Sequence, residues 1–580
     1  MDSKALFDFW MGHAYFDKET REELDKIKND EKEIEERFYR DLEFGTGGLR
    51  GIIGAGTNRM NIYTVRKASQ GLANYISSKG EEARKAGIAI AYDCRFRSPE
   101  FALEAAKVFA GNGIKAYLFD ELRPTPELSF AVRHLKASAG IVITASHNPK
   151  QYNGYKVYGD DGGQLALEGS NAVLEEINKI SDITTVKVME KEEAVDKGLL
   201  RIIGSDVDDA YIASLKTLSV NPGLVKEVAD KFKIVYTPLH GTGNKPVRRI
   251  LSEIGFKNVL VVKEQELPDS SFSTVKSPNP EEKSAFALAI ELAEKEDVDL
   301  IIGTDPDADR IGVVVRNAAG EYMVLTGNQT GCLLMEYILS QKKAAGQLPE
   351  KGFVVKTIVT TELARVIAAY YKVELVEVLT GFKYIGEKIK LMDEEGDKKY
   401  LFGFEESYGY LAGTFARDKD AVVAAMLIAE MAAYYNSRGM SLYEGLQEIF
   451  KKYGYSLEGI TSFTLEGKAG VERIKSTMST LREMRPTGFN GSAVAAIRDY
   501  QLGERYDLGG GKKEILELPE SDVLYYEMQD GSWFCIRPSG TEPKIKIYYG
   551  VSDSTLEASE KKLEALKENV LAVVKKLLYE

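Results

Sequence analysis

A strand–helix rhythm that recurs three times along this 580-residue chain constrains its fold more than any other feature. The first copy has apolar strands at 88–92, 116–119 and 140–144, with helical segments between them. The second has strands at 233–236, 259–262 and 300–303, and a looser third runs from Gly352 through Val376 to 400–404. Strands that alternate with helices predict parallel sheets with crossover helices. We therefore expect three related α/β units.

Each copy ends in an apolar strand that leads into a polar loop. The loops are Thr144-Ala-Ser-His-Asn-Pro149, Thr304-Asp-Pro-Asp-Ala-Asp-Arg310 and Phe404-Glu-Glu-Ser407. Ligands of open α/β sheets bind at the carboxyl ends of the strands. We therefore expect the three loops to face one shared cleft.

The two ends of the chain follow different patterns. Near the C-terminus, 523–528 and 533–536 predict a β-hairpin, and a further strand follows at 545–551. The amphipathic segment 556–578 predicts a helix that packs on this sheet rather than on a membrane. The first 43 residues are charged and helical in pattern, and 31–40 predicts a solvated helix face.

Composition and charge exclude several classes of protein. The net charge of −13 is unfavourable for general nucleic-acid binding, which depends on Lys and Arg that neutralise phosphates. The three cysteines, Cys94, Cys332 and Cys535, are far apart, which favours reduced thiols over disulfides and excludes a Cys-based zinc site of the usual spacing. No apolar run is long enough to span a membrane, and no signal peptide is visible at the N-terminus. We expect a cytoplasmic protein with neither a membrane nor a nucleic acid as its partner.

Alternate aspartates follow the second copy of the repeat. Asp305, Asp307 and Asp309 would share one face of an extended segment, where carboxylates repel one another unless a cation lies between them. Ligands that are all oxygen favour a hard ion such as Mg²⁺. An EF-hand is excluded, because Arg310 and Arg316 stand where that loop needs Gly and Glu. Arg310 itself could grip a phosphate or simply pair with an aspartate.

Ser146 has three candidate roles. A hydrolase nucleophile with His147 as its base is disfavoured, because adjacent side chains point apart and the G-x-S-x-G elbow is missing. A phosphoryl carrier is the second role, in which phosphoserine would offer an oxygen to the metal. The third is an ordinary loop serine that caps a backbone group.

Other loops offer groups suited to a phosphorylated sugar. The loop 537–544, Arg-Pro-Ser-Gly-Thr-Glu-Pro-Lys, combines a guanidinium, hydroxyls, an ammonium and a glycine, and predicts a phosphate clamp. The carboxylates and hydroxyl of 405–407 could bond sugar hydroxyls, and Arg417 and Lys419 add positive charge. The glycine-rich loop 44–51 and the segment 153–156 also look functional, but a P-loop is absent.

Together these loops resemble the α-D-phosphohexomutase family. The motifs TASHNP, DPDADR, EES-x-G and RPSGTEPK occur in the family's order, and the resemblance spans about residues 40 to 551. It implies a four-domain, heart-shaped protein: three related α/β domains with mixed sheets plus a C-terminal α+β domain around a central cleft. The expected domains are 1–205 with the phosphoserine loop, 206–325 with the metal loop, 326–455 with the sugar loop and 456–580 with the phosphate loop.

The resemblance also implies roles for individual residues. Ser146 would be the phosphoserine and would bind Mg²⁺ with Asp305, Asp307 and Asp309. Lys156 and His147 match positions with acid–base roles, which of the two accepts the proton being open, and Arg50 matches an arginine beside the phosphoserine. The expected substrate-binding set is Glu405, Ser407, Thr380, Gly381, Arg310, Arg417, Lys419, Arg537, Ser539, Gly540 and Thr541.

The implied activity is that of a phosphosugar mutase, an intramolecular phosphotransferase. It would interconvert glucose 1-phosphate and glucose 6-phosphate through phosphoserine, with glucose 1,6-bisphosphate as activator and intermediate. Gly47 stands where many members have Ser, and Glu-Glu-Ser-Tyr-Gly at 405–409 is most similar to phosphoglucomutases and to the branch that includes phosphopentomutases and glucose-1,6-bisphosphate synthases. The alternatives are a phosphopentomutase or phosphomannomutase, an enzyme that hydrolyses a phosphosugar, and a non-catalytic paralogue that binds one.

Overall fold

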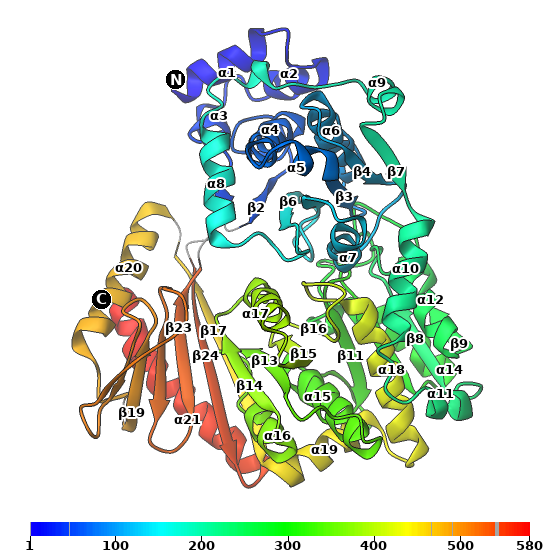
Figure 1. The fold of residues 1–580 in the computed structure, drawn as a ribbon. Helices are drawn as coiled ribbons and strands as arrows, with labels where there is room; N and C mark the ends of the chain where they lie inside the picture. The colour runs from blue at the N-terminus through cyan, green and yellow to red at the C-terminus, as the bar shows by residue number, and fades with distance from the viewer. Residues whose placement is uncertain (1, 46, 466, 490, 540–543, 580) are drawn as a thin grey trace. The chain divides into compact units, whose positions relative to one another are not determined.

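The computed structural model describes residues 2–45, 47–465, 467–489, 491–539 and 544–579 (Figure 1). It divides into two compact units, each of which is described by itself. Unit 1 comprises Met1–Gly327, Phe382–Gly403 and Ser407–Leu442, and unit 2 comprises Asn328–Gly381, Phe404–Glu406 and Tyr443–Glu580.

Unit 1 begins with a seven-stranded mixed sheet. Its strand order is β1-β2-β6-β5-β3-β4-β7. Every side chain of β3 (Ile88–Tyr92) is buried, as expected for a strand covered on both faces. The other strands are β1 (Phe44–Gly45), β2 (Gly48–Ile52), β4 (Ala116–Phe119), β5 (Ala139–Ile143), β6 (Tyr152–Gly159) and β7 (Leu200–Ile203). The helices are α4 (Ile62–Ser78), α5 (Glu81–Ala86), α6 (Ser98–Gly111), α7 (Thr125–Leu135), α8 (Leu167–Asn178) and α9 (Lys191–Asp196), with a 3₁₀ turn at Ile183–Thr185.

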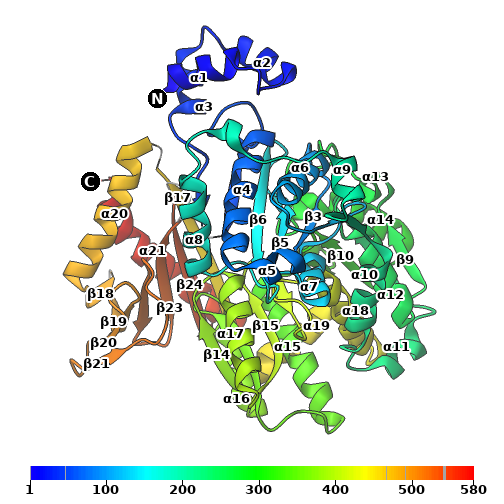
Figure 2. The ribbon, with the colours of Figure 1, turned by 45° about the horizontal axis from the view of Figure 1, so that its top comes forward.

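Three short helices precede this sheet: α1 (Ser3–Gly12), α2 (Lys18–Asp25) and α3 (Glu31–Phe38). Figure 2 shows them grouped together next to α4. Trp10 stacks on Phe16 with ring centroids 4.3 Å apart, and both side chains are buried. Ile34 and Phe38 of α3 join this aromatic core, so the prediction of a solvated face over 31–40 was wrong for these two positions. They alternate with charged residues at helical spacing, which is the pattern of a half-buried helix.

The second sheet of unit 1 repeats the topology of the first. Its order is β12-β11-β10-β8-β9, with β8 parallel to β9 and β10, and β10 antiparallel to β11. In the first sheet, β3 is likewise parallel to β4 and β5, and β5 is antiparallel to β6. The strands are β8 (Lys233–Thr237), β9 (Asn258–Val261), β10 (Leu300–Thr304), β11 (Ile311–Arg316) and β12 (Tyr322–Val324). The internal repeat and the mixed sheets implied by the family resemblance are therefore confirmed. The prediction of parallel sheets holds only for the strands joined by crossover helices, because β6 and β11 return antiparallel directly after the polar loops.

Seven further helices complete the described part of unit 1. They are α10 (Ser205–Lys216), α11 (Pro222–Val228), α12 (Asn244–Ile254), α13 (Lys263–Glu266), α14 (Ala287–Glu296), α17 (Phe382–Glu395) and α18 (Ala421–Ser437). A 3₁₀ turn, Lys283–Phe286, leads directly into α14. Strands β15 (Lys399–Glu405) and β16 (Gly409–Leu411) follow α17, and Glu405 belongs to unit 2.

Unit 2 holds the start of the third copy of the repeat and the C-terminal sheet. β13 (Gly352–Thr357) is parallel to β14 (Glu374–Val378), with α15 (Gly327–Ala344), α16 (Leu363–Tyr371) and α19 (Leu442–Tyr453) nearby in the chain. The C-terminal sheet has the order β17-β24-β23-β22-β19-β20-β21, and β18 (Gly488–Phe489) pairs with β19. Its strands are β17 (Tyr455–Thr464), β19 (Ser492–Asp499), β20 (Glu504–Asp507), β21 (Lys513–Ile515), β22 (Leu524–Met528), β23 (Trp533–Pro538) and β24 (Lys544–Asp553).

The C-terminal helix α21 (Leu556–Tyr579) packs on this sheet, as predicted. Leu563, Val570 and Val574 share one apolar core with Phe534 and Ile547, and α20 (Gly467–Met484) adds to it. Among the helices of the described residues, none is both long and apolar enough to cross a bilayer.

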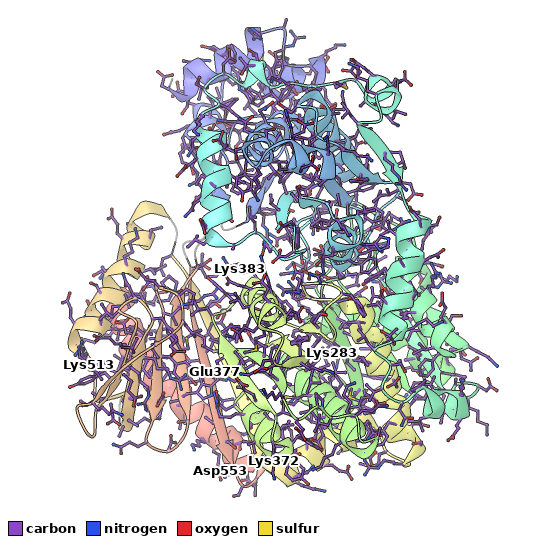
Figure 3. The ribbon with its side chains drawn as sticks, in the orientation of Figure 1. Lys283, Lys372, Glu377, Lys383, Lys513 and Asp553 are labelled. Atoms are coloured by element: carbon purple, nitrogen blue, oxygen red, sulfur yellow. The ribbon has the colours of Figure 1, made fainter. Side chains whose placement is uncertain are left out.

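A buried ion network lies between β14 and the C-terminal sheet. The fully buried Lys356 places its Nζ 2.8 Å from Glu362 and 3.0 Å from Glu377. Glu377, labelled in Figure 3, also pairs with Arg365 at 2.8 Å and with Arg498 of β19 at 3.4 Å. An unpaired buried ammonium would be strongly destabilising, so Lys356 depends on these two carboxylates, and Glu377 links it to Arg498 of the C-terminal sheet.

Candidate active site

Ser146 lies directly beyond β5, in the first of the three polar loops. Its side chain is almost completely buried, and its backbone is left-handed, with φ of 51°. Ser146 Oγ donates a hydrogen bond of 2.6 Å to Asp305 Oδ2 and lies 3.2 Å from His147 Nδ1. The argument that side chains 146 and 147 point apart was therefore wrong, because the left-handed turn brings them together. Since the hydroxyl proton is directed to Asp305, this contact does not make His147 a hydrolase base.

Asp305, Asp307 and Asp309 follow β10, at the topological position that corresponds to Ser146. All three side chains are buried, and one oxygen from each lies within 4.8 Å of the others. Within the described residues, Asp307 Oδ1 and Asp309 Oδ1 are buried and accept no hydrogen bond, although Arg310 Nε lies 3.7 Å from the latter. Buried carboxylate oxygens that lack donors are costly unless a cation serves them, so this cluster fits a metal ion.

The carboxylates perturb one another strongly. Burial and repulsion from Asp307 and Asp309 raise the pKa of Asp305 well above its ordinary value. Burial opposes ionisation of Asp307 as well, but the ammonium of Lys156 lowers the pKa of Asp307. Carboxylates whose environments drive their pKa values apart occur at catalytic and metal sites.

Two lysines line the cluster. Lys156 of β6 places Nζ 2.8 Å from Asp307 Oδ2 and 3.4 Å from Asp309 Oδ2. Lys419 places Nζ 3.1 Å from Asp309 Oδ2 and 3.0 Å from Asp418. Although burial opposes the charge of Lys156, the two aspartates raise its pKa. Both predicted lysines therefore reach the aspartates, with Lys156 as their closest cation.

The predicted arginines are placed differently. Arg310 pairs with Glu281 at 2.8 Å, and Arg50 Nη1 lies 3.4 Å from the side-chain oxygen of Asn148 in the serine loop. Arg417 pairs with Asp393 at 2.6 Å. Arg310 therefore pairs with a glutamate that sequence reasoning did not single out.

Thr125, at the N-terminus of α7, is a site residue that sequence reasoning missed. Its hydroxyl donates to Asp307 Oδ2 at 2.8 Å, and its backbone N–H donates to the Asp307 carbonyl at 2.9 Å. No sequence signal could have found it, because it lies 182 residues before its partner. Thr125 fixes the metal loop from the first sheet of unit 1.

The predicted sugar loop lies partly in unit 2. Glu405 is buried, and its Oε1 accepts the backbone N–H of Gly381 at 2.8 Å. Thr380, next to Gly381, has a buried hydroxyl oxygen with no hydrogen-bond partner among the described residues. Three of the predicted substrate-binding residues therefore lie together, whereas Ser407 belongs to unit 1.

The predicted phosphate loop begins at the end of β23. Arg537 and Pro538 pair with Lys546 and Ile545 of β24, and Ser539 N donates to the Lys544 carbonyl at 2.7 Å. Gly540 and Thr541 lie outside the described residues. The hairpin exit thus presents Arg537 and Ser539 next to each other on the C-terminal sheet.

Comparison with known proteins assigns the family. Four family models match in order, all described as phosphoglucomutase/phosphomannomutase: α/β/α domain I at residues 41–184, domain II at 209–320, domain III at 326–453 and the C-terminal domain at 489–568. This chain belongs to the phosphoglucomutase/phosphomannomutase family. Ser146, the aspartate triplet, Glu405 and Arg537 each fall in a different one of the four matches.

Individual relatives agree with this assignment. A phosphoglucomutase of Staphylococcus saprophyticus is 39% identical over 535 residues, which is 92% of this chain and 95% of the relative. One of Staphylococcus epidermidis (strain ATCC 35984) is 40% identical over 521 residues, 90% of this chain and 92% of the relative. The protein is therefore an enzyme, a phosphosugar mutase, and the closeness to phosphoglucomutases expected from the sequence is confirmed.

Solved structures show the same fold at low identity. Paramecium pp63/parafusin, a phosphoglucomutase, matches with a TM-score of 0.67 and 16% identity over 93% of this chain and 95% of that chain. A putative phosphomannomutase of Thermus thermophilus matches with a TM-score of 0.66 and 22% identity, over 92% of this chain and 99% of that chain. The expected domain boundaries at 205, 325 and 455 and the shared cleft stay predictions.

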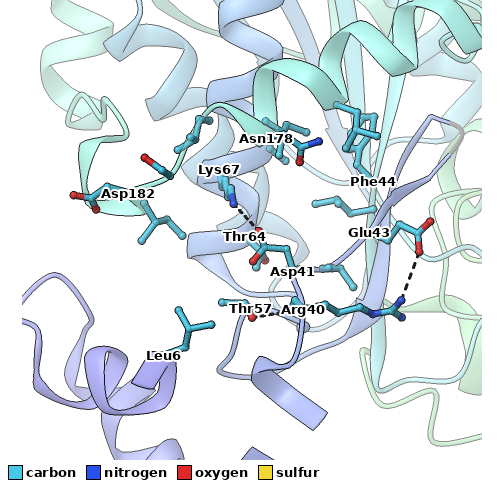
Figure 4. Close-up of a pocket in the computed structure, with 18 of the residues that line it drawn as sticks. Leu6, Arg40, Asp41, Glu43, Phe44, Thr57, Thr64, Lys67, Asn178 and Asp182 are labelled. Carbon is cyan, nitrogen blue, oxygen red and sulfur yellow. Dashed lines mark hydrogen bonds and ion pairs between the residues drawn. The ribbon is translucent and has the colours of Figure 1, made fainter. Parts of the chain in front are cut away.

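A cavity of this phosphosugar mutase lies away from the serine and aspartate loops. It has a volume of about 650 Å³ and is bounded by α1, the 40–44 segment, α4 and the chain after α8 (Figure 4). Lys67 pairs with Asp41 at 2.7 Å, and Arg40 lies 3.7 Å from Glu43, so its charged side chains compensate one another. None of the predicted site residues lines it.

Proposed function

We propose that this enzyme interconverts glucose 1-phosphate and glucose 6-phosphate, with Ser146 as the phosphoryl carrier. The observation that carries the proposal is the 2.6 Å contact between Ser146 Oγ and Asp305 Oδ2. It joins the carrier oxygen of the first sheet to the carboxylate cluster of the second. Similarity over nine-tenths of the chain to staphylococcal proteins named phosphoglucomutase supports glucose as the sugar.

Asp305, Asp307 and Asp309 would hold one Mg²⁺, together with an oxygen on Ser146. Among the described residues the cluster consists of three carboxylates without His or Cys, and such a set of oxygen ligands favours a hard divalent cation. When bound, the ion neutralises phosphoryl oxygens as charge spreads during transfer. Lys156, now paired with Asp307 and Asp309, would be free to contact the phosphoryl group once a cation takes its place.

The chemistry is a pair of reciprocal transfers. The bond from Ser146 Oγ to phosphorus breaks, and a bond from the free sugar hydroxyl to phosphorus forms. His147, or Lys156 as the neutral amine, accepts the proton of that hydroxyl, and a proton returns to Ser146 Oγ as it leaves phosphorus. Glucose 1,6-bisphosphate then reorients, and its other phosphoryl group returns to Ser146.

The remaining predicted residues would orient the sugar and its non-transferring phosphate. Arg537 and Ser539, with Gly540 and Thr541, form the proposed phosphate clamp, in which the arginine fork grips two oxygens. The proposed sugar contacts are Glu405, Ser407, Thr380 and Gly381. Arg50, Arg310, Arg417 and Lys419 supply the positive charge that an acidic protein must concentrate around an anionic substrate.

A coupled assay tests this function. With Mg²⁺ and a trace of glucose 1,6-bisphosphate, glucose 1-phosphate should turn over rapidly to glucose 6-phosphate, and a chelator should abolish turnover. Ribose 1-phosphate and mannose 1-phosphate run in parallel. Preference for either would make the enzyme a phosphopentomutase or a phosphomannomutase and would overturn only the sugar assignment. Steady release of inorganic phosphate would instead identify a phosphatase.

The Ser146→Ala variant is the matched control. It removes one hydroxyl that bonds Asp305, so the fold should persist while turnover disappears. Retained turnover in this variant would refute the phosphoryl-carrier role of Ser146.

A further inference from the structure

Arg95 is a buried arginine whose guanidinium forms hydrogen bonds with the backbone of the serine loop. Its side chain is almost completely inaccessible. Nη2 donates to the carbonyl oxygens of Ser146 and Asn148, each at 2.5 Å. Nη1 donates to the carbonyl oxygens of Pro149 and Tyr152, each at 3.0 Å. One side chain thus satisfies four carbonyls between residues 146 and 152.

The partners of Asp93 complete this support. Asp93 is fully buried, and its Oδ2 lies 3.3 Å from Arg95 Nε. The same Oδ2 accepts the Thr144 hydroxyl at 2.7 Å, and Thr144 Oγ1 in turn accepts the backbone N–H of Ser146 at 2.8 Å. Arg95 therefore holds the carbonyl of Ser146, while Asp93 holds its N–H through Thr144.

The backbone conformation of Ser146 explains why both of these contacts are needed. A left-handed φ of 51° is unfavourable for a residue other than glycine. Such a conformation persists only where the surroundings determine it. Here the conformation directs Oγ toward Asp305. Loss of either the Arg95 contact or the Thr144 contact would therefore let the serine move away from the aspartate cluster.

We propose that Arg95 and Thr144 are positioning residues that lock the phosphoryl-carrier serine in its left-handed conformation. The inference rests on the proposed role of Ser146. Within the part of the chain that the structure describes, Arg95 contacts neither the three clustered aspartates nor the proposed substrate groups, so its effect on turnover would pass through the loop. A lysine could not replace it, because one ammonium has three donors and no planar fork that spans four carbonyls.

Two pairs of variants test the proposal. Arg95→Lys keeps the charge and removes the fork, and its control is Arg66→Lys, a half-buried arginine of α4 that pairs with Glu104 away from the loop. Thr144→Val removes the hydroxyl with almost no change in shape, and Thr144→Ser restores it. Each protein is measured for kcat, KM and thermal unfolding. The phosphoserine of each is also followed over time, as transfer to glucose 1-phosphate and as hydrolysis in buffer alone.

The expected result is a loss of kcat without a matching change in KM, which a merely structural role would not give. Arg95→Lys and Thr144→Val should lose kcat by on the order of 10²-fold with little change in KM, as expected when a reacting group is misplaced by about 1 Å. In both variants, the rate of phosphoserine hydrolysis should increase relative to the rate of phosphoryl transfer to the sugar. Arg66→Lys and Thr144→Ser should behave as the wild type.

Distinct failures separate this inference from the proposed function. Wild-type protein that never carries phosphate on Ser146 would refute the function and the inference together. The inference alone would be refuted if wild-type Ser146 carries phosphate but Arg95→Lys and Thr144→Val keep the wild-type kcat. The same variants would also have to keep the wild-type ratio of transfer to hydrolysis. If Arg95→Lys fails to fold, the Thr144 pair decides, and equal kcat in Thr144→Val and Thr144→Ser would refute the proposal.

Discussion

Thr125 shows how a single hydroxyl can govern the aspartate cluster from another sheet. Its hydroxyl and the ammonium of Lys156 both bond Asp307 Oδ2 at 2.8 Å. The hydroxyl therefore fixes the carboxylate while leaving Oδ1 available to a cation. Partners that orient a metal ligand in this way are typically worth 10- to 100-fold in metal affinity.

We predict that Thr125→Val weakens Mg²⁺ binding by on the order of 10-fold and lowers turnover at limiting Mg²⁺. Titration calorimetry with Mg²⁺ measures the affinity. Thr125→Ser, which keeps the hydroxyl, should bind as the wild type does. Equal affinity in Thr125→Val and Thr125→Ser would show that the hydroxyl does not orient Asp307.

At the residue scale, the sequence revealed the candidate residues that stand close together along the chain. Ser146 and the aspartates stand in short motifs, so the sequence alone was enough to single them out as candidates. Thr125 and Arg95 act on loops far along the chain, and distance in sequence hides them. The relation of His147 to Ser146 was misjudged because a left-handed turn, unlike a strand, brings neighbouring side chains together.

At the scale of elements, the loop after β8 shapes the metal loop. A Cβ on Gly241 would lie 2.5 Å from Pro306 Cα and 2.6 Å from the Pro306 carbonyl oxygen. Thr242 N also donates to that carbonyl at 2.8 Å. Pro306 stands between two of the aspartates, so the two loops must approach this closely for the cluster to form.

Gly241→Ala should therefore shift Pro306 and separate the carboxylates. We expect loss of most Mg²⁺ binding and turnover, with a smaller effect on thermal stability, since the clash is confined to two loops. Gly223→Ala, on α11, where a Cβ meets open space, is the control. Normal Mg²⁺ affinity in Gly241→Ala would contradict the close approach.

Glu458 of β17 gives unit 2 a dependence on pH. Burial raises its pKa to about 7 from an ordinary value of 4.5, against the lowering effect of hydrogen bonds with Thr361 and Asn328. The folded state therefore binds more protons than the unfolded state between these values. Its contribution to stability is complete below about pH 4.5 and is lost as pH rises through 7.

Glu458→Gln is neutral at every pH and should escape that loss. We predict that its unfolding midpoint rises relative to wild type between pH 5 and pH 8, as measured by calorimetry. The exposed Glu564 of α21 provides the control Glu564→Gln. A difference between Glu458→Gln and wild type that stays constant with pH would exclude a raised pKa at Glu458.

Element positions were predicted well wherever an apolar run was continuous. The strands at 88–92 and 116–119 were predicted with the observed bounds, because fully buried strands are apolar at every position. The pattern at 31–40 was harder, since charged residues outnumber the two positions that α3 buries. Its burial depends on Trp10 and Phe7, which only the tertiary structure brings to it.

For the whole molecule, the proposed site residues are divided between the two units. Ser146 and the aspartates belong to unit 1, and Arg537 and Glu405 to unit 2. The sequence assigned the four motifs to four expected domains and did not predict a division into two units. It did not predict the buried Lys356 network that links β14 to the C-terminal sheet, because the sequence around a lysine in an apolar strand does not show which residues pair with it.

The division predicts separable defects. Arg537→Ala should raise KM for the phosphosugar by about 10- to 100-fold, the loss expected for a charged hydrogen bond to phosphate, and should leave Mg²⁺ affinity unchanged. Arg473→Ala, an exposed arginine on α20, is the control. A wild-type KM in Arg537→Ala would remove this arginine from the proposed clamp.

The most direct test of the central claim is the phosphorylation of Ser146 itself. The purified enzyme is incubated with glucose 1,6-bisphosphate and Mg²⁺, and the peptide that contains residues 144–149 is examined by mass spectrometry before and after addition of glucose 1-phosphate. The account predicts one phosphoryl group on Ser146, which passes to the sugar when glucose 1-phosphate is added. Turnover of glucose 1-phosphate with Ser146 never phosphorylated, or with the phosphoryl group on another residue, would contradict it.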